Sequence, residues 1–119
     1  MPEIERDAAI RGRTLRWSWT EGPTRDQTHE HRFGEDGIVT WRSVKADELP
    51  ARPADPGHGG ERATYAALRL AEHIHLVSYL APSGFTLTVA VNLEDGTIAG
   101  FASGAEAWFP VRGTNEVVE

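Results

Sequence analysis

The chain has 119 residues, 39% hydrophobic and 25% charged side chains and no cysteine, so it fits one domain over residues 1–119 that folds without disulfides. Its 12 Lys and Arg against 18 Asp and Glu give a net charge of -6, which disfavours a nucleic-acid partner, because phosphate binding needs clustered basic residues. The apolar runs have strand length and the N-terminus lacks the apolar core of a secretory signal. We therefore expect a soluble, cytoplasmic protein that does not insert into a membrane.

The first part of the chain predicts three strands after a short helical turn. Residues 3–11 carry the helical turn, and alternating apolar side chains predict strands at 14–20, 28–33 and 38–44. The segment Glu35-Asp36-Gly37 is typical of a hairpin turn, because glycine tolerates a positive φ. Residues 45–60 are rich in proline and glycine and show no apolar period, so they predict a long loop.

The second part of the chain predicts five more strands, at 63–70, 73–80, 85–92, 97–103 and 107–112. Their separators, such as 81–84 and 93–96, read as tight reversals, which join antiparallel neighbours. Eight such strands hide their edges best by closing on themselves. We expect an all-β, eight-stranded antiparallel up-and-down barrel; a two-sheet sandwich is the alternative, with 45–60 as its long connection.

Alternation within each strand predicts which side chains point into the barrel. Strand 14–20 places Trp17 and Trp19 inside, and strand 85–92 does the same for Val89. In strand 73–80 the more apolar face holds Leu76 and Ser78 and begins at Glu72, so we expect this face to be inward and the faces of His73 and His75 to be outward. Strand 38–44 is ambiguous, and one of its two orientations places Arg42 inside.

A carboxylate and a guanidinium inside a small apolar barrel are costly unless they meet each other, a ligand or water. Glu72 and Arg42 beside two tryptophans therefore predict a small-molecule site with apolar walls and a few polar groups. In this interpretation Glu72 is the general acid or base, with a pKa raised by the apolar surroundings, and Arg42 anchors an anionic oxygen. The alternative is that both side chains lie at the rim, in solvent.

Three segments resemble the molybdenum cofactor biosynthesis F (MoaF) family of small calycin-like barrels: GRTLRWSWTEG at 12–22, THEHRFGEDGIVTWRSV at 28–44, and the segment from SYLAPSGF to FPVRGT at 78–114. The resemblance covers most of the chain outside 45–60, and its most specific part is 78–114. The resemblance implies a calycin-like or lipocalin-like barrel fold, and the family's name implies no particular reaction.

A fainter resemblance is to the phenolic acid decarboxylases, which are eight-stranded barrels that need no metal or cofactor. Their site uses two tyrosines on the first strand, an arginine on the third and a glutamate before the fifth. The matching positions here are Trp17, Trp19, Arg42 and Glu72. Both tyrosines are replaced by tryptophan, whose indole offers one N–H donor and no acidic proton, which puts hydroxycinnamate decarboxylation in doubt.

Two His-x-His pairs, His29/His31 and His73/His75, have the spacing that places both imidazoles on one face of a strand. With Glu35, the first pair resembles part of a cupin metal motif, but the histidine that should follow Pro82-Ser83-Gly84 is missing. We therefore expect surface histidines and no bound metal.

The sequence thus predicts a barrel that binds a small planar or anionic organic molecule and acts on it, without a cofactor, by acid/base chemistry of the lyase or isomerase type. The predicted site consists of Glu72 and Arg42 as catalytic residues, with Trp17, Trp19, Ser78, Leu76 and Val89 contacting the ligand. Two alternatives stay open: a non-catalytic binding or carrier protein, and an interaction module that forms a homodimer through an exposed strand face.

Overall fold

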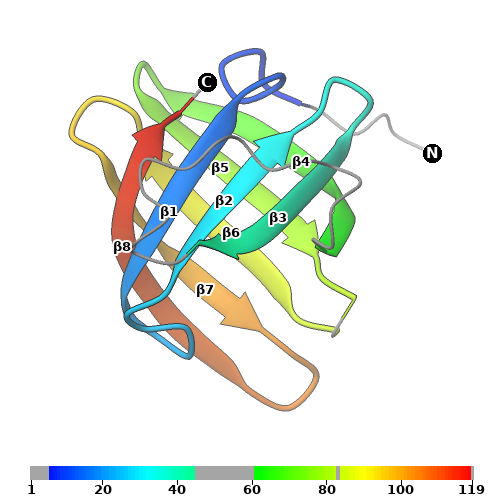
Figure 1. The fold of residues 1–119 in the computed structure, drawn as a ribbon, viewed down its shortest axis with the longest axis vertical. Helices are drawn as coiled ribbons and strands as arrows, with labels where there is room; N and C mark the ends of the chain where they lie inside the picture. Colours follow the sequence, from blue (N-terminus) through cyan, green and yellow to red (C-terminus); the bar gives the residue numbers. More distant parts are fainter. Residues whose placement is uncertain (1–5, 45–60, 83, 119) are drawn as a thin grey trace.

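A computed structural model describes residues 6–44, 61–82 and 84–118, and it is a closed barrel of eight antiparallel strands in sequence order (Figure 1). The all-β, eight-stranded up-and-down barrel expected from the sequence is confirmed, and the sandwich is not formed. The strands are β1 (Thr14–Glu21), β2 (Thr28–Phe33), β3 (Ile38–Val44), β4 (Glu61–Ala71), β5 (Ile74–Leu80), β6 (Thr86–Asn92), β7 (Thr97–Ser103) and β8 (Trp108–Val117).

The main difference from the predicted elements is the length of β8, which extends five residues beyond the expected end at Arg112. These residues pair with β1 on one side, where Leu15 faces Val117, and with β7 on the other, where Thr97 faces Thr114. Pairing between the first and last strands closes the barrel and leaves no open edge. The expected loop at 45–60 lies outside the described residues.

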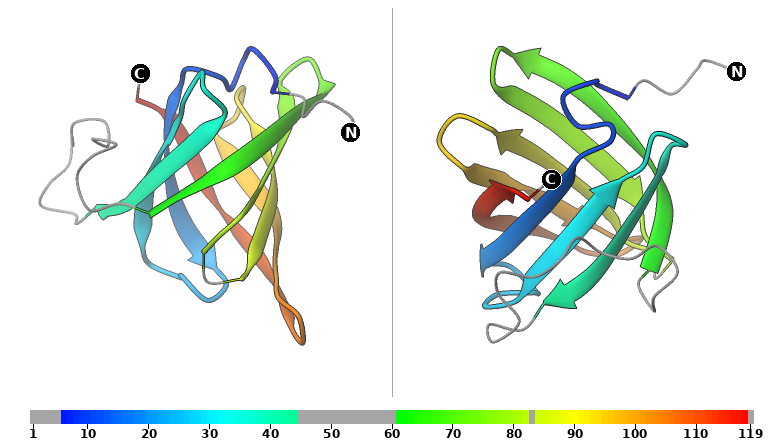
Figure 2. Two further views of the ribbon diagram at one scale, coloured as in Figure 1. Left: turned by 90° about the vertical axis from the view of Figure 1, so that its right-hand side faces the viewer. Right: turned by 45° about the horizontal axis from the view of Figure 1, so that its top comes forward.

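One end of the barrel is closed by the N-terminal segment (Figure 2). From Arg6 onward this segment forms a short hydrogen-bonded turn, in which the amides of Ile10 and Arg11 donate to the carbonyl oxygen of Asp7 at 3.0 and 2.9 Å. Ile10 is fully buried, and Asp7 bonds the buried His75 of β5. The remainder of the expected turn at 3–11 lies outside the described residues. No helix in the described part of the chain is long and apolar enough to cross a membrane.

The inward faces of β1 and β6 are as predicted, with Trp17, Trp19 and Val89 buried in the core. The prediction for β5 is wrong: His75, Val77 and Tyr79 are buried, while Leu76 and Ser78 are half-buried on the outward face. The register explains the exchange, since Val77 lies opposite the inward Val89, and residues directly opposite on neighbouring strands share one face of the sheet. Both faces of β5 are apolar, so alternation within the strand did not separate them.

Candidate functional site

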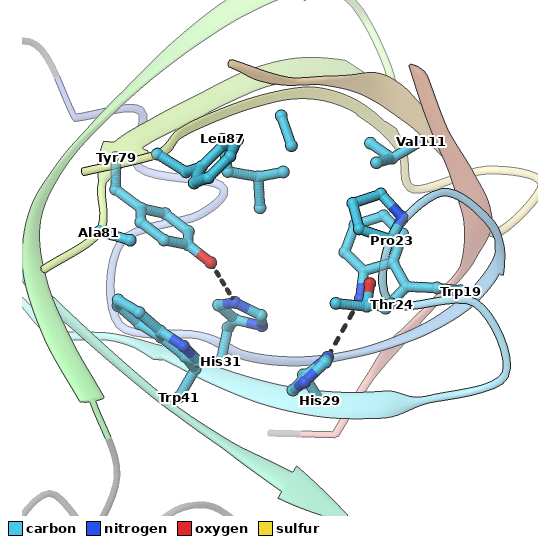
Figure 3. A pocket seen from close by; sticks show the side chains of 12 residues that line it. Trp19, Pro23, Thr24, His29, His31, Trp41, Tyr79, Ala81, Leu87 and Val111 are labelled. Carbon is cyan, nitrogen blue, oxygen red and sulfur yellow. Dashed lines mark hydrogen bonds between the residues drawn. The ribbon is translucent and has the colours of Figure 1, made fainter. Parts of the chain in front are cut away.

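A cavity of about 230 Å³ occupies the barrel interior at the end opposite the N-terminal segment (Figure 3). It lies where β1 turns into β2 and β5 into β6, so its walls combine strand residues with loop residues. The described lining residues are Trp19, Pro23, Thr24, His29, His31, Trp41, Tyr79, Ala81, Phe85, Leu87, Ala102 and Val111. Aromatic and aliphatic side chains dominate this wall, and no Asp, Glu, Lys or Arg is among these described residues.

The aromatic part of the wall is a packed group of rings from β2, β3 and β5. The rings of Trp41 and Tyr79 lie 4.5 Å apart between centroids, and the ring of His31 stacks on Trp41 at 5.8 Å and 17°. Beneath them Trp17 packs against His31 at 4.2 Å. Flat rings held in this way form a rigid surface on which a planar molecule can stack.

His31 is the most buried polar residue of the site, with 2% of its surface exposed. Its Nε2 forms a 2.7 Å hydrogen bond with the hydroxyl of Tyr79, and its Nδ1 has no hydrogen-bond partner among the residues that the structure describes. Burial, with a smaller contribution from neighbouring His29, holds the pKa of His31 well below its usual 6.5. His31 is therefore a neutral imidazole near pH 7.

His29 is held by a hydrogen bond that identifies its tautomer. The indole N–H of Trp19 donates to Nδ1 of His29 at 3.1 Å. Because an indole nitrogen only donates, Nδ1 of His29 must be the unprotonated nitrogen. The neutral ring of His29 therefore carries its proton on Nε2, and both histidines present fixed hydrogen-bonding groups to the cavity end of the barrel (Figure 3).

Of the ligand-contacting residues predicted from the sequence, only Trp19 lines the cavity. Trp17 lies deeper in the core, where its N–H donates to Oδ1 of Asn115 at 3.0 Å, and Val89 is a buried core residue. Leu76 and Ser78 lie on the outward face of β5, where the hydroxyls of Ser78 and Thr88 bond each other at 2.9 Å.

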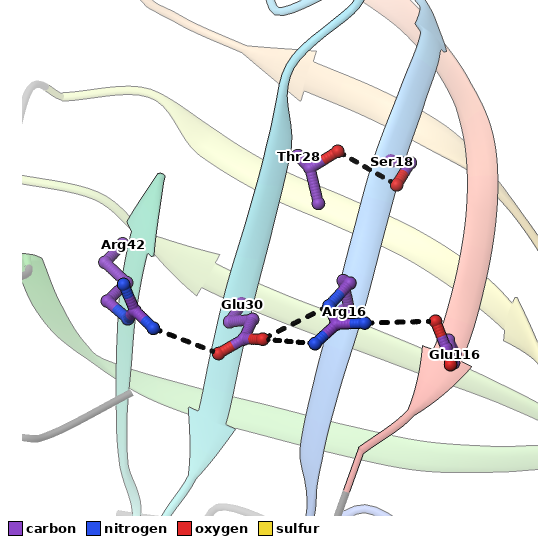
Figure 4. A network of polar contacts seen from close by, with 6 residues as sticks. All are labelled: Arg16, Ser18, Thr28, Glu30, Arg42 and Glu116. Carbon is purple, nitrogen blue, oxygen red and sulfur yellow. Dashed lines mark hydrogen bonds and ion pairs between the residues drawn. The ribbon is translucent and has the colours of Figure 1, made fainter. Parts of the chain in front are cut away.

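The two predicted catalytic residues do not reach the cavity. Glu72 is exposed in the turn between β4 and β5. Arg42 lies on the outward face of β3, because its neighbour Trp41 points inward, and its Nη2 is 3.6 Å from Oε1 of Glu30 (Figure 4). The prediction that Glu72 and Arg42 face the interior is therefore wrong, and the acid/base site built on that orientation loses its structural basis.

Glu30 is the centre of a separate polar network on the outward face of the barrel (Figure 4). It is fully buried, and its Oε2 accepts hydrogen bonds from Nε and Nη2 of Arg16 at 3.1 and 2.8 Å. Arg16 also lies 3.4 Å from the exposed Glu116 of β8. These ion pairs link β1, β2, β3 and β8, so the network holds the sheet together rather than contributing to the cavity.

Sequence reasoning missed His31, Trp41 and Tyr79 as site residues. The prediction that the histidines lie on the surface is correct for exposed His73 and wrong for His31 and His75, which are both buried. The signal that was present is the pair His29/His31 opposite Trp17 and Leu15, since these residues are cross-strand partners on an inward face. In the described part of the chain no three His, Cys, Asp or Glu side chains gather as metal ligands.

Comparison with family models and with curated proteins finds no match to the chain. Among solved structures, the chain resembles one described as "Crystal Structure of a putative beta-lactamase from Burkholderia vietnamiensis", with a TM-score of 0.70. The match covers 96% of this chain and 99% of that one at 15% sequence identity. At this identity the likeness concerns the fold, and it shows that the same barrel is formed by a different sequence.

Proposed function

We propose that the protein binds a small, planar, uncharged organic molecule in the barrel cavity. The observation that carries this proposal is the cavity itself: about 230 Å³ of space walled by Trp19, Trp41 and Tyr79, with neutral His31 at its base. Concave, mostly apolar sites with a few fixed polar groups are the usual form of small-molecule sites.

The cavity volume limits the size of the ligand. An apolar cavity of about 150 Å³ holds benzene, and sites for drug-sized molecules begin at about 300 Å³. A cavity of about 230 Å³ therefore fits one substituted ring or a small bicyclic system. The closely packed rings of Trp41 and Tyr79 favour a flat molecule over a branched one.

The electrostatics of the wall favour an uncharged ligand over the anion that the sequence suggested. Arg42, the expected anion anchor, lies outside the barrel, and His31 is neutral. A carboxylate taken from water into such a wall loses its hydration without gaining a countercharge from the described lining residues, which is costly.

Binding is proposed rather than a lyase or isomerase reaction, because the carboxylate assigned to proton transfer, Glu72, is exposed in a turn. The carrier alternative needs only the cavity. Membership of the MoaF family is part of the same proposal, and it rests on the three sequence segments that resemble that family.

Calorimetric titration with 2-naphthamide and 2-naphthoate tests the proposal, because the two probes share a shape and differ in charge. We expect the amide to bind at least ten-fold more tightly than the carboxylate. The variant Ala102→Phe fills the cavity and should abolish binding of the amide, whereas Ala105→Phe, at an exposed position outside the cavity, should leave it unchanged. Equal binding of both probes, or unchanged binding by Ala102→Phe, contradicts the proposal.

A further inference from the structure

The outward surface of the barrel differs sharply between its two halves. On β1, β2 and β3 it carries charged side chains such as Arg16, Glu30 and Arg42. By contrast, β5, β6 and β7 contain no Asp, Glu, Lys or Arg, although 25% of the whole chain is charged. An antiparallel sheet that faces water on one side normally carries polar residues on that side. The outward residues of these three strands are instead uncharged, and they mix apolar side chains such as Leu76 and Phe101 with small polar residues.

The strand register shows that these uncharged residues form one continuous outward surface, which we call the outer apolar face after its largest side chains. Leu76 lies between Leu68 and Ala90, and Phe101 lies between Thr88 and Pro110. Nearer the open end, Leu80 and Trp108 lie at the two ends of a third row. The face comprises Leu68, Leu76, Ser78, Leu80, Thr86, Thr88, Ala90, Ala99, Phe101, Ser103, Trp108 and Pro110.

This face leaves a large apolar area in water. Trp108 is 69% exposed, Leu80 62%, Phe101 49% and Leu68 40%. If a large side chain presents roughly 150–250 Å² in full, these four residues leave on the order of 450 Å² exposed. This area is about half of the roughly 800 Å² that one partner contributes to a standard protein interface. Contiguous apolar patches of this size mark interaction sites.

We infer that the outer apolar face is the interface between two copies of this chain. Each copy carries a net charge of -6, so most approaches between copies are repulsive, whereas the residues of this face include no acidic group, and the charged residue beside Ala99 is Arg112. The face offers no charged group by which an oppositely charged partner would be recognised, and an uncharged surface is complementary to itself. The hydroxyls of Ser78 and Thr88 bond each other, so one of their two O–H donors keeps its partner when the face is buried.

Sedimentation equilibrium over about 1 to 100 µM protein tests this inference. We expect a species of twice the 13.1 kDa chain mass. Phe101→Glu places a charge at the centre of the face and should raise the dissociation constant at least about 100-fold. Val117→Glu is the matched control, because Val117 is a similarly exposed apolar residue (44%) at the far end of β8, and it should leave the dimer intact. Circular dichroism of both variants serves as the test that they fold.

A second measurement does not depend on the folding of Phe101→Glu. The wild-type chain has no cysteine, so a flexible bismaleimide can link only introduced thiols. Ala90→Cys, within the face, should give a covalent dimer, and Ser43→Cys, exposed on β3, should not. A wild-type monomer throughout the concentration range overturns the inference. So does a dimer that survives Phe101→Glu, or a monomer that binds phosphatidylcholine vesicles through this face.

Discussion

Replacing His31 by asparagine should change how the stability of the protein depends on pH. In the folded chain the pKa of His31 lies well below 6.5 because the ring is buried beside His29. In the unfolded chain the same side chain titrates at about 6.5. Between these two values the unfolded state binds the extra proton, so the free energy of unfolding falls as the pH falls below about 6.5.

The size of this effect follows from the unfolded-state pKa alone, as long as folded His31 stays neutral. Between pH 7.5 and pH 5.5, protonation of unfolded His31 lowers the free energy of unfolding by about 1.4 kcal/mol. Asp7, whose pKa is held below 3.8 by the Ala9 amide and His75 despite burial, does not titrate in this window. The variant His31→Asn lacks the effect, so its pH dependence should be weaker than that of the wild type by about this amount.

Urea unfolding at pH 7.5 and pH 5.5, at one protein concentration, measures the difference between wild type and His31→Asn. His73→Asn serves as the control, because His73 is exposed and pairs with Glu94 at 3.1 Å on the surface. In this control variant the buried ring of His31 is intact, so the contribution of His31 to the pH dependence should remain. If wild type and His31→Asn lose equal stability over this range, His31 is not a buried neutral imidazole and the account of the site is wrong.

Two further predictions concern the barrel wall. Glu30→Ala leaves Arg16 without its buried carboxylate, so chemical unfolding should show a loss of about 3 kcal/mol in the free energy of unfolding. Glu116→Ala removes the exposed partner of Arg16 and should cost less than about 1 kcal/mol. Equal losses in the two variants contradict the buried network. In Gly100→Ala the new Cβ would lie 2.0 Å from the carbonyl oxygen of Thr88, so thermal unfolding should show that the free energy of unfolding falls by more than about 2 kcal/mol. Gly104→Ala is the control, because its new Cβ would meet the ring of Phe85, and its free energy of unfolding should be nearly that of the wild type.

The sequence by itself determined the strands and their antiparallel order. Side-chain alternation and turn residues such as Gly37, Gly84 and Gly96, which all adopt positive φ, act over a few neighbouring positions. Short turns between eight strands leave few arrangements other than a closed barrel. The inward position of Trp17 and Trp19 could be predicted for the same reason, since only one face of β1 is strongly apolar.

Only the tertiary structure decided which face of β5 is inward and where the site lies. Both faces of β5 are apolar, so its orientation depends on pairing with β6, where Val77 meets Val89. His31 and Tyr79 are 48 positions apart, and barrel closure alone brings them into hydrogen-bonding distance. Burial then holds His31 neutral. These features depend on contacts between distant segments, and alternation within one strand carries no information about such contacts.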